Sequence, residues 1–234
     1  MADKIGTGDF VRVEFTGRRA AGGAVFDTTD AAKAKEAGIF NERYKYGPSL
    51  VVVGKGMVVK GMDEALAGMS VGESRKLELQ PEQAFGLRMP SLIRVIPLSE
   101  FRKRDVSPQP GMMIELDGNP AMVKSVTSGR VMVDMNHTLA GDKILYDVKV
   151  TEKLEGMDKK VRAILQENGL EPGAVKATAD AAEIAFKPES GGEARHFVAK
   201  TAFLRAAKEL LPELKKVRFD EEFTLSETKD AKKE

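Results

Sequence analysis

Cysteine and tryptophan are absent from the 234-residue sequence, and histidine occurs only twice, as His137 and His196. Without cysteine the chain forms neither disulfides nor thiolate metal sites and has no cysteine nucleophile. Two isolated histidines exclude a histidine-rich metal site. No apolar run approaches the roughly 18 residues of a membrane-spanning helix, and the opening MADKIGTGDF lacks the apolar run of a signal peptide. We therefore expect a soluble, cytoplasmic protein with no cofactor, no metal and no membrane partner.

An excess of one charge is also missing, since 37 lysines and arginines nearly balance 36 aspartates and glutamates. A dedicated nucleic-acid-binding protein normally carries a basic excess on at least one domain, so we expect no specific nucleic acid as a partner. Hydrophobic residues make up 42% of the chain, which is enough for a sizeable core. The length predicts one or two domains with room for a small additional module.

Motifs for phosphate binding, hydrolysis and metal binding are lacking as well. Gly54-Lys55-Gly56 precedes a strand-like Val58-Val59 and is not followed by Gly-Lys-Ser/Thr, so it predicts a hairpin turn and not a phosphate loop. The strained Gly-x-Ser-x-Gly turn of a serine nucleophile does not occur. His137 follows Asp134 and Asn136 without a second histidine nearby, and we expect it to tie the end of a loop by a hydrogen bond.

What is present is an alternation of apolar and polar residues that favours short strands. Residues 8–27 predict two strands, and a polar, helix-tolerant segment follows at 30–46. Further strands are expected at 50–53, 75–79 and 144–153, with one or two helical turns over 61–67 that end at Gly68.

Composition changes between Arg88 and His137, where five of the ten prolines and six of the eleven methionines lie. Short strands are expected there at 111–116, 121–126 and 130–135. Because the strand at 144–153 resumes the earlier pattern, we interpret the segment as an inserted β module.

The pattern becomes helical after Gly156. A helix is predicted from an apolar repeat at helical spacing, formed by Met157, Val161, Ile164 and Leu165. A strand over 175–186, an amphipathic helix over 196–211 and a strand over 215–225 are expected to follow. The predicted domains are therefore a first domain over 1–87 and 138–153, an inserted domain over 88–137, a C-terminal α+β domain over 156–226 and a flexible tail over 227–234.

Several spaced motifs of the first domain resemble those of FKBP-type peptidyl-prolyl cis-trans isomerases. They are VEFTG at 13–17 with VFDT at 25–28, the run from Val53 to Glu73, PEQAFG at 81–86 and YDVKV at 146–150. The run 134–141 resembles the end of the insert-in-flap module of the SlyD-like branch, and the region after Gly156 is similar in layout to that of long archaeal-type members. The resemblance implies an α+β fold in which an antiparallel sheet wraps around a short helix, with an inserted small β module and a C-terminal α+β domain.

The resemblance also implies isomerisation of X-Pro bonds, a rotation opposed by a barrier of about 20 kcal/mol that requires no nucleophile. A dry pocket that grips proline lowers this barrier, because the twisted amide is less polar than the planar one. By resemblance, Asp27 lies at the edge of the pocket and orients or polarises the substrate carbonyl; taken alone, it is equally a turn residue that caps 28–30. The residues implied to line the pocket are Phe26, Val58, Val59, Met62, Phe85 and Tyr146.

Two departures from the family pattern keep a second function open. Phe15 and Phe85 stand where many relatives carry tyrosine, so two hydroxyl groups that bond the carboxylate or a ligand are missing. The alternative to a folding isomerase is a holdase-type chaperone with weak or no isomerase activity.

Methionines mark a second candidate site in the inserted module, at Met112, Met113, Met122, Met132 and Met135. Flexible, polarisable methionine side chains suit surfaces that bind varied apolar partners; the alternative is that they fill a poorly packed core. The resemblance implies that such modules hold unfolded, proline-containing polypeptides and deliver them to the isomerase pocket. We expect substrate to contact Ile114, Met122 and Met132 of the module, together with Phe15 and Leu139.

Two further partners stay open at this point. The basic cluster Arg102-Lys103-Arg104 with Arg94 is either a solvated face or a means of attraction towards the ribosome. The apolar face of the helix over 196–211 either packs within its own domain or forms a homodimer. The last residues contain neither histidine nor cysteine, so we expect none of the nickel binding that the tails of SlyD-like relatives imply.

Overall fold

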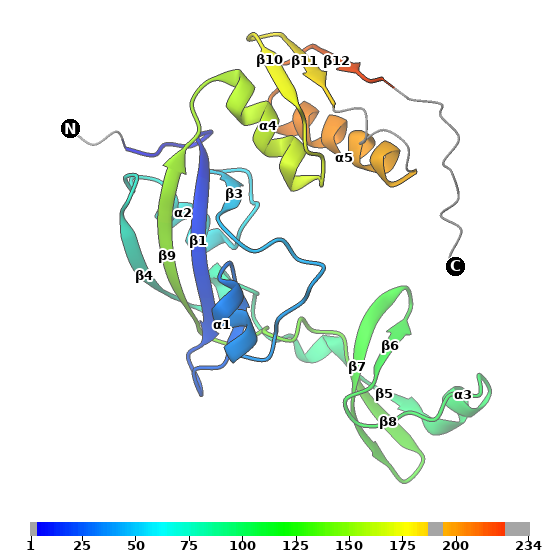
Figure 1. Ribbon diagram of the computed structural model, residues 1–234. Coiled ribbons are helices and arrows are strands. Elements are labelled where there is room, and N and C mark those ends of the chain that lie inside the picture. The colour runs from blue at the N-terminus through cyan, green and yellow to red at the C-terminus, as the bar shows by residue number, and fades with distance from the viewer. Residues whose placement is uncertain (1–3, 187–193, 223–234) are drawn as a thin grey trace, which may run out of the picture.

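The computed structural model describes residues 4–186 and 194–222, which contain three β-sheets (Figure 1). The first sheet has the order β2-β1-β9-β4, with β3 paired to β1, and all of its pairs are antiparallel. Its strands are β1 (Phe10–Arg19), β2 (Val25–Thr28), β3 (Ser49–Val52), β4 (Ser74–Leu79) and β9 (Ile144–Lys153). The predicted α+β class with an antiparallel sheet is confirmed.

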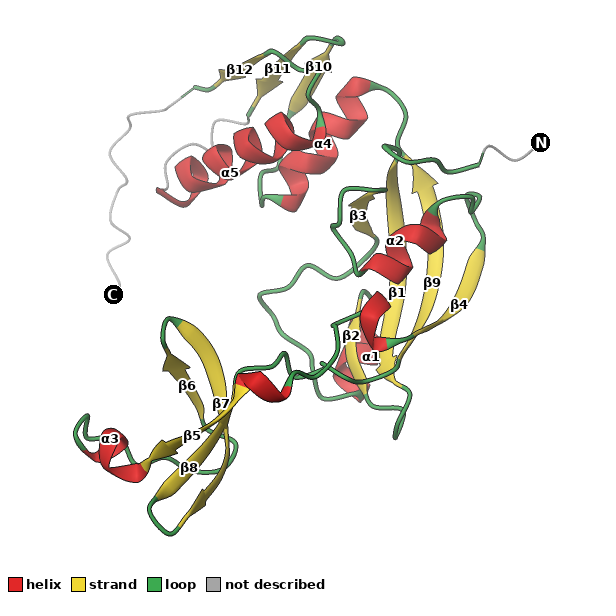
Figure 2. Ribbon diagram, turned by 180° about the vertical axis from the view of Figure 1, so that it is seen from behind, coloured by secondary structure: helices red, strands yellow, loops and turns green. Residues whose placement is uncertain are grey.

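The first sheet encloses a short helix, α2 (Lys60–Leu66), which lies across its face (Figure 2). Alternate valines of β1 and β9 point to this face, and Met62 and Leu66 of α2 pack among them in one buried cluster. Burial of this apolar surface is the main stabilising term for the sheet and the helix together. A second short helix, α1 (Ala31–Glu36), begins at Asp30, whose carboxylate accepts the amides of Ala32 and Lys33 at 2.8 and 3.2 Å.

The loop between β3 and α2 differs from the sequence prediction. Val58 and Val59 form no strand but lead directly into α2, so the glycine-rich turn before them does not close a hairpin. The amides of Gly54 and Gly56 donate to the two carboxylate oxygens of Asp63, at 2.8 and 3.3 Å. The anion that occupies this loop is therefore a side chain of the protein itself.

The inserted module is a four-stranded antiparallel sheet of order β5-β8-β7-β6, and it stands apart from the first sheet (Figures 1 and 2). Its own core surrounds Phe101, Val123, Val131 and Val133. Its elements are β5 (Ile93–Pro97), α3 (Leu98–Arg102), β6 (Met113–Leu116), β7 (Asn119–Thr127) and β8 (Arg130–Asp134), and the 3₁₀ turns Pro81–Gln83 and Pro90–Leu92 precede it. Neither β5 nor α3 is among the elements predicted from the sequence; Pro97, a residue that disfavours strands, ends β5 and directly precedes α3.

The C-terminal region forms a three-stranded sheet covered on one face by two helices (Figure 2). The single strand predicted over 175–186 is wrong: a turn at 178–180, closed by the Thr178 amide on the Ala181 carbonyl at 2.8 Å, divides it into a hairpin. The predicted last strand ends at Asp220, and residues 223–234, with the predicted tail, lie outside the described residues. The elements are α4 (Met157–Glu167), β10 (Ala174–Ala177), β11 (Ala181–Ala185), α5 (Ala194–Leu210) and β12 (Lys216–Asp220).

The C-terminal region shares one hydrophobic core with the first sheet. Phe10, Leu50 and Val52 lie in the same buried cluster as Ile164 and Leu165 of α4. A continuous apolar interior therefore joins these two parts of the chain across the predicted boundary between residues 153 and 156. The domain boundaries stay predictions. Within the described ranges, no helix has both the length and the apolar character needed to cross a membrane.

Candidate active site

The pairing of β1 with β9 brings an aromatic cluster together at one end of the first sheet. Its register places Gly17 opposite Tyr146. The ring of Phe26, from β2, lies edge-on to Tyr146 with 5.8 Å between centroids, and edge-on to Phe85 at 5.6 Å. Phe15 also lies edge-on to Tyr146, with 6.0 Å between centroids. Edge-to-face contacts at these distances are favourable beyond the area that they bury, so four rings from separate segments support one another.

Gly17 makes the close approach of these rings possible. A β-carbon at this position would lie 2.6 Å from Cε1 of Tyr146 and 2.7 Å from Cζ of Phe26. Any side chain would therefore displace both rings, which is the usual meaning of glycine inside a strand. The sequence motif contained Gly17, but the residue was not identified as part of the site; its interior strand position was the available signal.

The segment that contains α2 contributes three apolar side chains to the same hydrophobic core. Met62 is fully buried, and Val58 and Val59 just before α2 are half-buried against the same core. The predicted pocket residues Phe26, Val58, Val59, Met62, Phe85 and Tyr146 thus all belong to one cluster, with Phe15. All but Met62 and Tyr146 keep part of their surface exposed, so the cluster presents an apolar wall to solvent.

Asp27 lies at the rim of this wall. The residue as a whole is exposed, yet its carboxyl is partly withdrawn from water, which raises its pKa, while the Thr28 amide acts in the opposite direction. Burial, with a further contribution from the Asp27 charge, raises the pKa of the Tyr146 hydroxyl. The carboxylate is therefore close enough to act electrostatically on the aromatic cluster. The bond from the Thr28 amide also agrees with the alternative role of a turn residue at 28–30.

His137 borders the cluster from the segment that leaves the inserted module. Its imidazole lies parallel to the ring of Phe85, with 4.7 Å between centroids and 4° between planes. Its Nδ1 accepts the amide of Leu139 at 3.2 Å. The predicted role of His137 in tying a loop is confirmed, whereas its ring contact with Phe85 was not foreseen.

Similarity to known proteins agrees with this geometry. A model of FKBP-type peptidyl-prolyl cis-trans isomerases matches residues 2–95. The chain is also 38% identical over 152 residues to the short-type peptidyl-prolyl cis-trans isomerase of Methanocaldococcus jannaschii, covering 65% of this chain and 96% of that protein. The chain belongs to the FKBP-type peptidyl-prolyl cis-trans isomerase family.

Further matches concern the inserted module and the bacterial relatives of this FKBP-type chain. A model described as the FKBP26 IF domain matches residues 94–139. An FKBP-type 16 kDa isomerase of Escherichia coli is 30% identical over 110 residues, covering 45% of this chain and 73% of that protein. SlyD of Helicobacter pylori is 23% identical over 125 residues, covering 52% and 68% respectively. The predicted resemblance to SlyD-like members is thereby confirmed.

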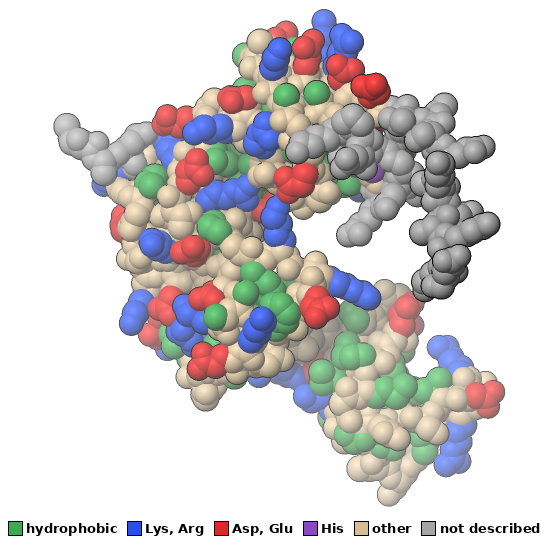
Figure 3. All heavy atoms as spheres, viewed as in Figure 1, with side chains coloured by type: hydrophobic (Ala, Val, Ile, Leu, Met, Phe, Trp, Pro, Cys, Tyr) green, Lys and Arg blue, Asp and Glu red, His purple; other side chains and the backbone are tan. Residues whose placement is uncertain are grey.

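The inserted module of this FKBP-type chain exposes apolar side chains on one face of its sheet. Strand register aligns Val95 with Met132 and Met113 with Met122. Three of these side chains are well exposed, at 57% for Val95, 54% for Met113 and 41% for Met132, and Met122 is half-buried. We call these four residues the methionine face; Figure 3 shows hydrophobic side chains gathered on this module.

Ile114 lies on the opposite face of that sheet, because successive residues of β6 alternate in direction. It packs against the core of the module and lines a groove of about 530 Å³ beside α3. The structure therefore does not place Ile114 together with Met122 and Met132, and Leu139 is buried. The groove is lined by Arg94, Val95, Ile96, Glu100, Phe101, Arg104, Val106, Met112, Met113, Ile114, Glu115 and Leu116.

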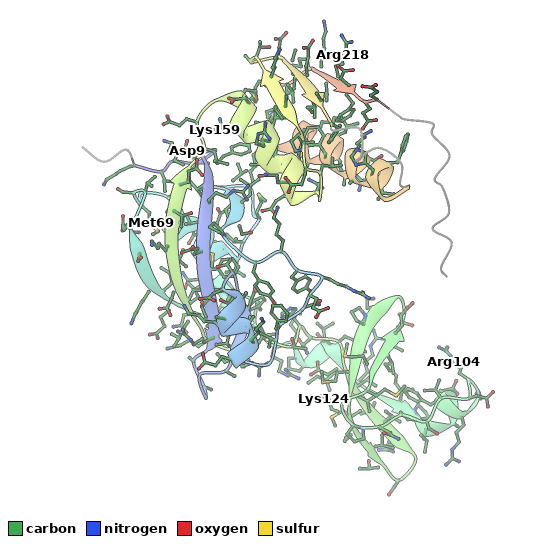
Figure 4. The ribbon with its side chains drawn as sticks, viewed as in Figure 1. Asp9, Met69, Arg104, Lys124, Lys159 and Arg218 are labelled. Atoms are coloured by element: carbon green, nitrogen blue, oxygen red, sulfur yellow. The ribbon has the colours of Figure 1, made fainter. Side chains whose placement is uncertain are left out.

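The predicted basic cluster is partly neutralised within the module. Arg94 pairs with Asp117 at 2.8 Å and Lys103 with Glu100 at 2.7 Å. Arg104 lies on the side of the module far from the first sheet (Figure 4). In the part of the chain that the structure describes, no group of three histidine or acidic side chains is placed to hold a metal ion.

Proposed function

We propose that this FKBP-type chain catalyses the cis-trans isomerisation of X-Pro bonds at the aromatic cluster. The observation that carries this proposal is the set of edge-to-face rings of Phe26, Phe85 and Tyr146, which share one hydrophobic core with buried Met62, with Asp27 at the rim. The relatives from Methanocaldococcus jannaschii and Escherichia coli, named as peptidyl-prolyl cis-trans isomerases, support it.

The chemistry requires positioning and not bond formation. Rotation about the X-Pro bond interrupts amide resonance, so the amide is least polar where the energy is highest. An apolar wall that excludes water removes the solvent that favours the planar form, and thereby stabilises the twisted form relative to it. The carboxylate of Asp27, near the wall but in contact with solvent, orients the carbonyl dipole of the substrate.

We further propose that the inserted module holds unfolded, proline-containing polypeptides for this site. Its methionine face supplies exposed, adaptable apolar side chains. The groove beside α3, which shares Val95 and Met113 with that face, supplies a concave, largely apolar surface. Both suit hydrophobic segments that unfolded chains expose and folded proteins bury. The polypeptide class, and not one particular protein, is the expected partner.

The test compares two substrates in the full-length protein: a short X-Pro peptide and an unfolded protein whose refolding is limited by proline isomerisation. We expect Asp27→Ala to slow both reactions about tenfold or more, the value of one charge-assisted contact. Met132→Glu should slow only the protein reaction, because it adds a charge to the methionine face. Met112→Glu tests the groove in the same way.

Val71→Glu is the matched control, since Val71 is an exposed apolar residue of the first domain, 47% accessible, outside the aromatic cluster and the module. If the wild-type protein suppresses aggregation but accelerates neither reaction, the chain is a holdase and the isomerase proposal is wrong. If Met132→Glu and Met112→Glu both refold the protein substrate at the wild-type rate, the module does not hold it.

A further inference from the structure

Phe85 is held by side chains more than by regular structure. It follows the 3₁₀ turn Pro81–Gln83 and lies in no strand or helix. Phe26 contacts its ring from one side at 5.6 Å, and His137 covers it in parallel at 4.7 Å. A half-buried ring on a loop loses rotamer freedom when a ligand binds, at a cost in affinity, unless neighbouring groups have already fixed it.

His137 is itself fixed by the main chain of the segment that follows it. The Leu139 amide donates to Nδ1, and the Ala140 amide donates to the carbonyl of His137 at 2.9 Å. One step further on, the Gly141 amide donates to the carbonyl of Gly86 at 2.8 Å, directly beside Phe85. An imidazole that accepts at Nδ1 has its plane set by that bond, so the backbone determines the angle at which the ring meets Phe85.

We propose that His137 is a positioning residue for the isomerase reaction, which holds the ring of Phe85 in the wall of the proline site. The inference rests on the proposed function for the location of that site. Because His137 lies on the exit segment of the inserted module, the same side chain couples the attachment of the module to the wall. A wall contacts the substrate in both its planar and its twisted form, so loss of His137 raises KM while kcat changes little.

Three substitutions in the full-length protein separate the parts of this role. His137→Ala removes both the ring and the acceptor. His137→Phe keeps a flat ring but has no acceptor, and His137→Asn keeps an oxygen near the place of Nδ1 but has no ring. Thr138→Ala is the matched control, since Thr138 is the exposed neighbour of His137 in the described part of the chain.

With a short X-Pro peptide, we expect KM to rise about three- to tenfold in His137→Ala and His137→Asn, the value of one aromatic contact. His137→Phe should restore KM to within about twofold of wild type, and kcat should stay within about twofold throughout. Hydrogen exchange of the Leu139 amide should accelerate in His137→Ala and His137→Phe but not in His137→Asn. If a general loss of structure were the cause, the change in KM would follow the fall in melting temperature of each variant and would not divide the variants in this way.

Each other result has a definite meaning. An active wild-type protein with an unchanged KM in His137→Ala overturns the positioning role and leaves the proposed function in place. A His137→Phe variant as weak as His137→Ala shows that ring stacking is not the means, and overturns the inference as well. A wild-type protein without activity on any X-Pro peptide, but with a protected Leu139 amide, overturns the proposed function itself.

Discussion

The rings of Phe26 and Tyr146 meet edge to face, with 5.8 Å between centroids, beside Gly17, where neither ring leaves room for a side chain. These three residues come from three adjacent strands, Phe26 from β2, Gly17 from β1 and Tyr146 from β9. They meet through the register of β1 with β2 and β9. This part of the candidate site is thus a direct product of strand pairing. A substitution at Gly17 should therefore displace both rings.

Gly17→Ala tests this relationship. The added methyl group would overlap Tyr146 and Phe26 at 2.6 and 2.7 Å, so both rings must move, and we expect a loss of about 1–3 kcal/mol in the free energy of unfolding. Isomerase activity on a short peptide should fall about tenfold, because the displaced rings form the wall. Denaturant unfolding and peptide kinetics measure the two effects. Gly6→Ala is the control, since its β-carbon would have 3.8 Å to the nearest atom, Asp9 Oδ2; equal losses in both variants would contradict the prediction.

The first sheet could be predicted because its strands are encoded locally, and the resemblance to the family named residues that the structure places in one hydrophobic cluster. Alternation along β1 and β9 marks the buried face, and the family motifs place Phe26, Phe85 and Tyr146 in order. Prediction from the sequence failed where local preference and context disagree. Val58 and Val59 have the β-branched character of a strand but precede a helix, and the alanine-rich segment at 175–186 conceals the turn that divides it.

The features of the site that the sequence did not predict depend on contacts between residues far apart in the chain. No spacing in the sequence shows that His137 will stack on Phe85, because the inserted module separates the two residues by 52 positions. The methionine face was foreseen as a group of exposed methionines, but its membership was not. Ile114 was expected with Met122 and Met132, and only the pairing of β6 with β7 shows that it points the other way.

Asp27 lowers the stability of the folded protein while it serves the site. Its pKa is raised by partial burial, so the folded state favours the protonated form, and the ionised form becomes a cost as the pH rises from the unfolded-state pKa through the folded-state pKa. Asp27→Asn removes that cost. We expect it to stabilise the protein at neutral pH by less than about 1 kcal/mol, since solvent screens an exposed carboxylate, and to lower isomerase activity.

The measurement for Asp27 is denaturant unfolding at several pH values. The advantage of Asp27→Asn over wild type should be present at neutral pH and should shrink as the pH falls through the folded-state pKa of Asp27, where the wild-type carboxyl becomes neutral as well. Asp30→Asn is a poor substitute for this test because Asp30 caps α1. A stabilisation that persists unchanged at low pH would show that burial of the charge is not the cause.

Glu167 of α4 links the C-terminal region to the edge strand β3. Its Oε1 accepts the Leu50 amide at 2.7 Å and lies 3.6 Å from a guanidinium nitrogen of Arg12. Glu167→Ala leaves that amide without its acceptor, and we expect a loss of about 1–2 kcal/mol in the free energy of unfolding. Because Leu50 belongs to the core that the two parts share, β3 and α4 should unfold together in one transition and not in separate transitions.

Glu171→Ala is the control for Glu167. Glu171 also forms an ion pair with the first domain, to Lys45 at 3.0 Å, but both side chains are more than half exposed, so its loss should change stability by less than about 0.5 kcal/mol. Thermal unfolding followed at two wavelengths measures both variants. Equal effects of the two substitutions would mean that the bond to Leu50 adds nothing to a surface ion pair.

Asn136 joins the two segments by which the inserted module is attached. Its side-chain oxygen accepts the Met89 amide at 2.8 Å, and its nitrogen donates to the Met89 carbonyl at 3.0 Å and to buried Asp134 at 2.8 Å. Asn136→Ala removes all three bonds and should let the module change its orientation relative to the aromatic cluster.

A short X-Pro peptide reaches that cluster without the module, so its isomerisation in Asn136→Ala should stay within about twofold of wild type. Refolding of a protein substrate should slow about three- to tenfold, because the effective concentration of the held chain falls. Parallel assays of the two substrates measure this ratio. Asn119→Ala is the control, because the Asn119 side chain donates to the Asp117 carbonyl within the exposed β6–β7 turn, away from the attachment of the module. An equal fall in both assays would show that Asn136 supports the wall itself, and no change in either would show that the orientation of the module does not limit transfer.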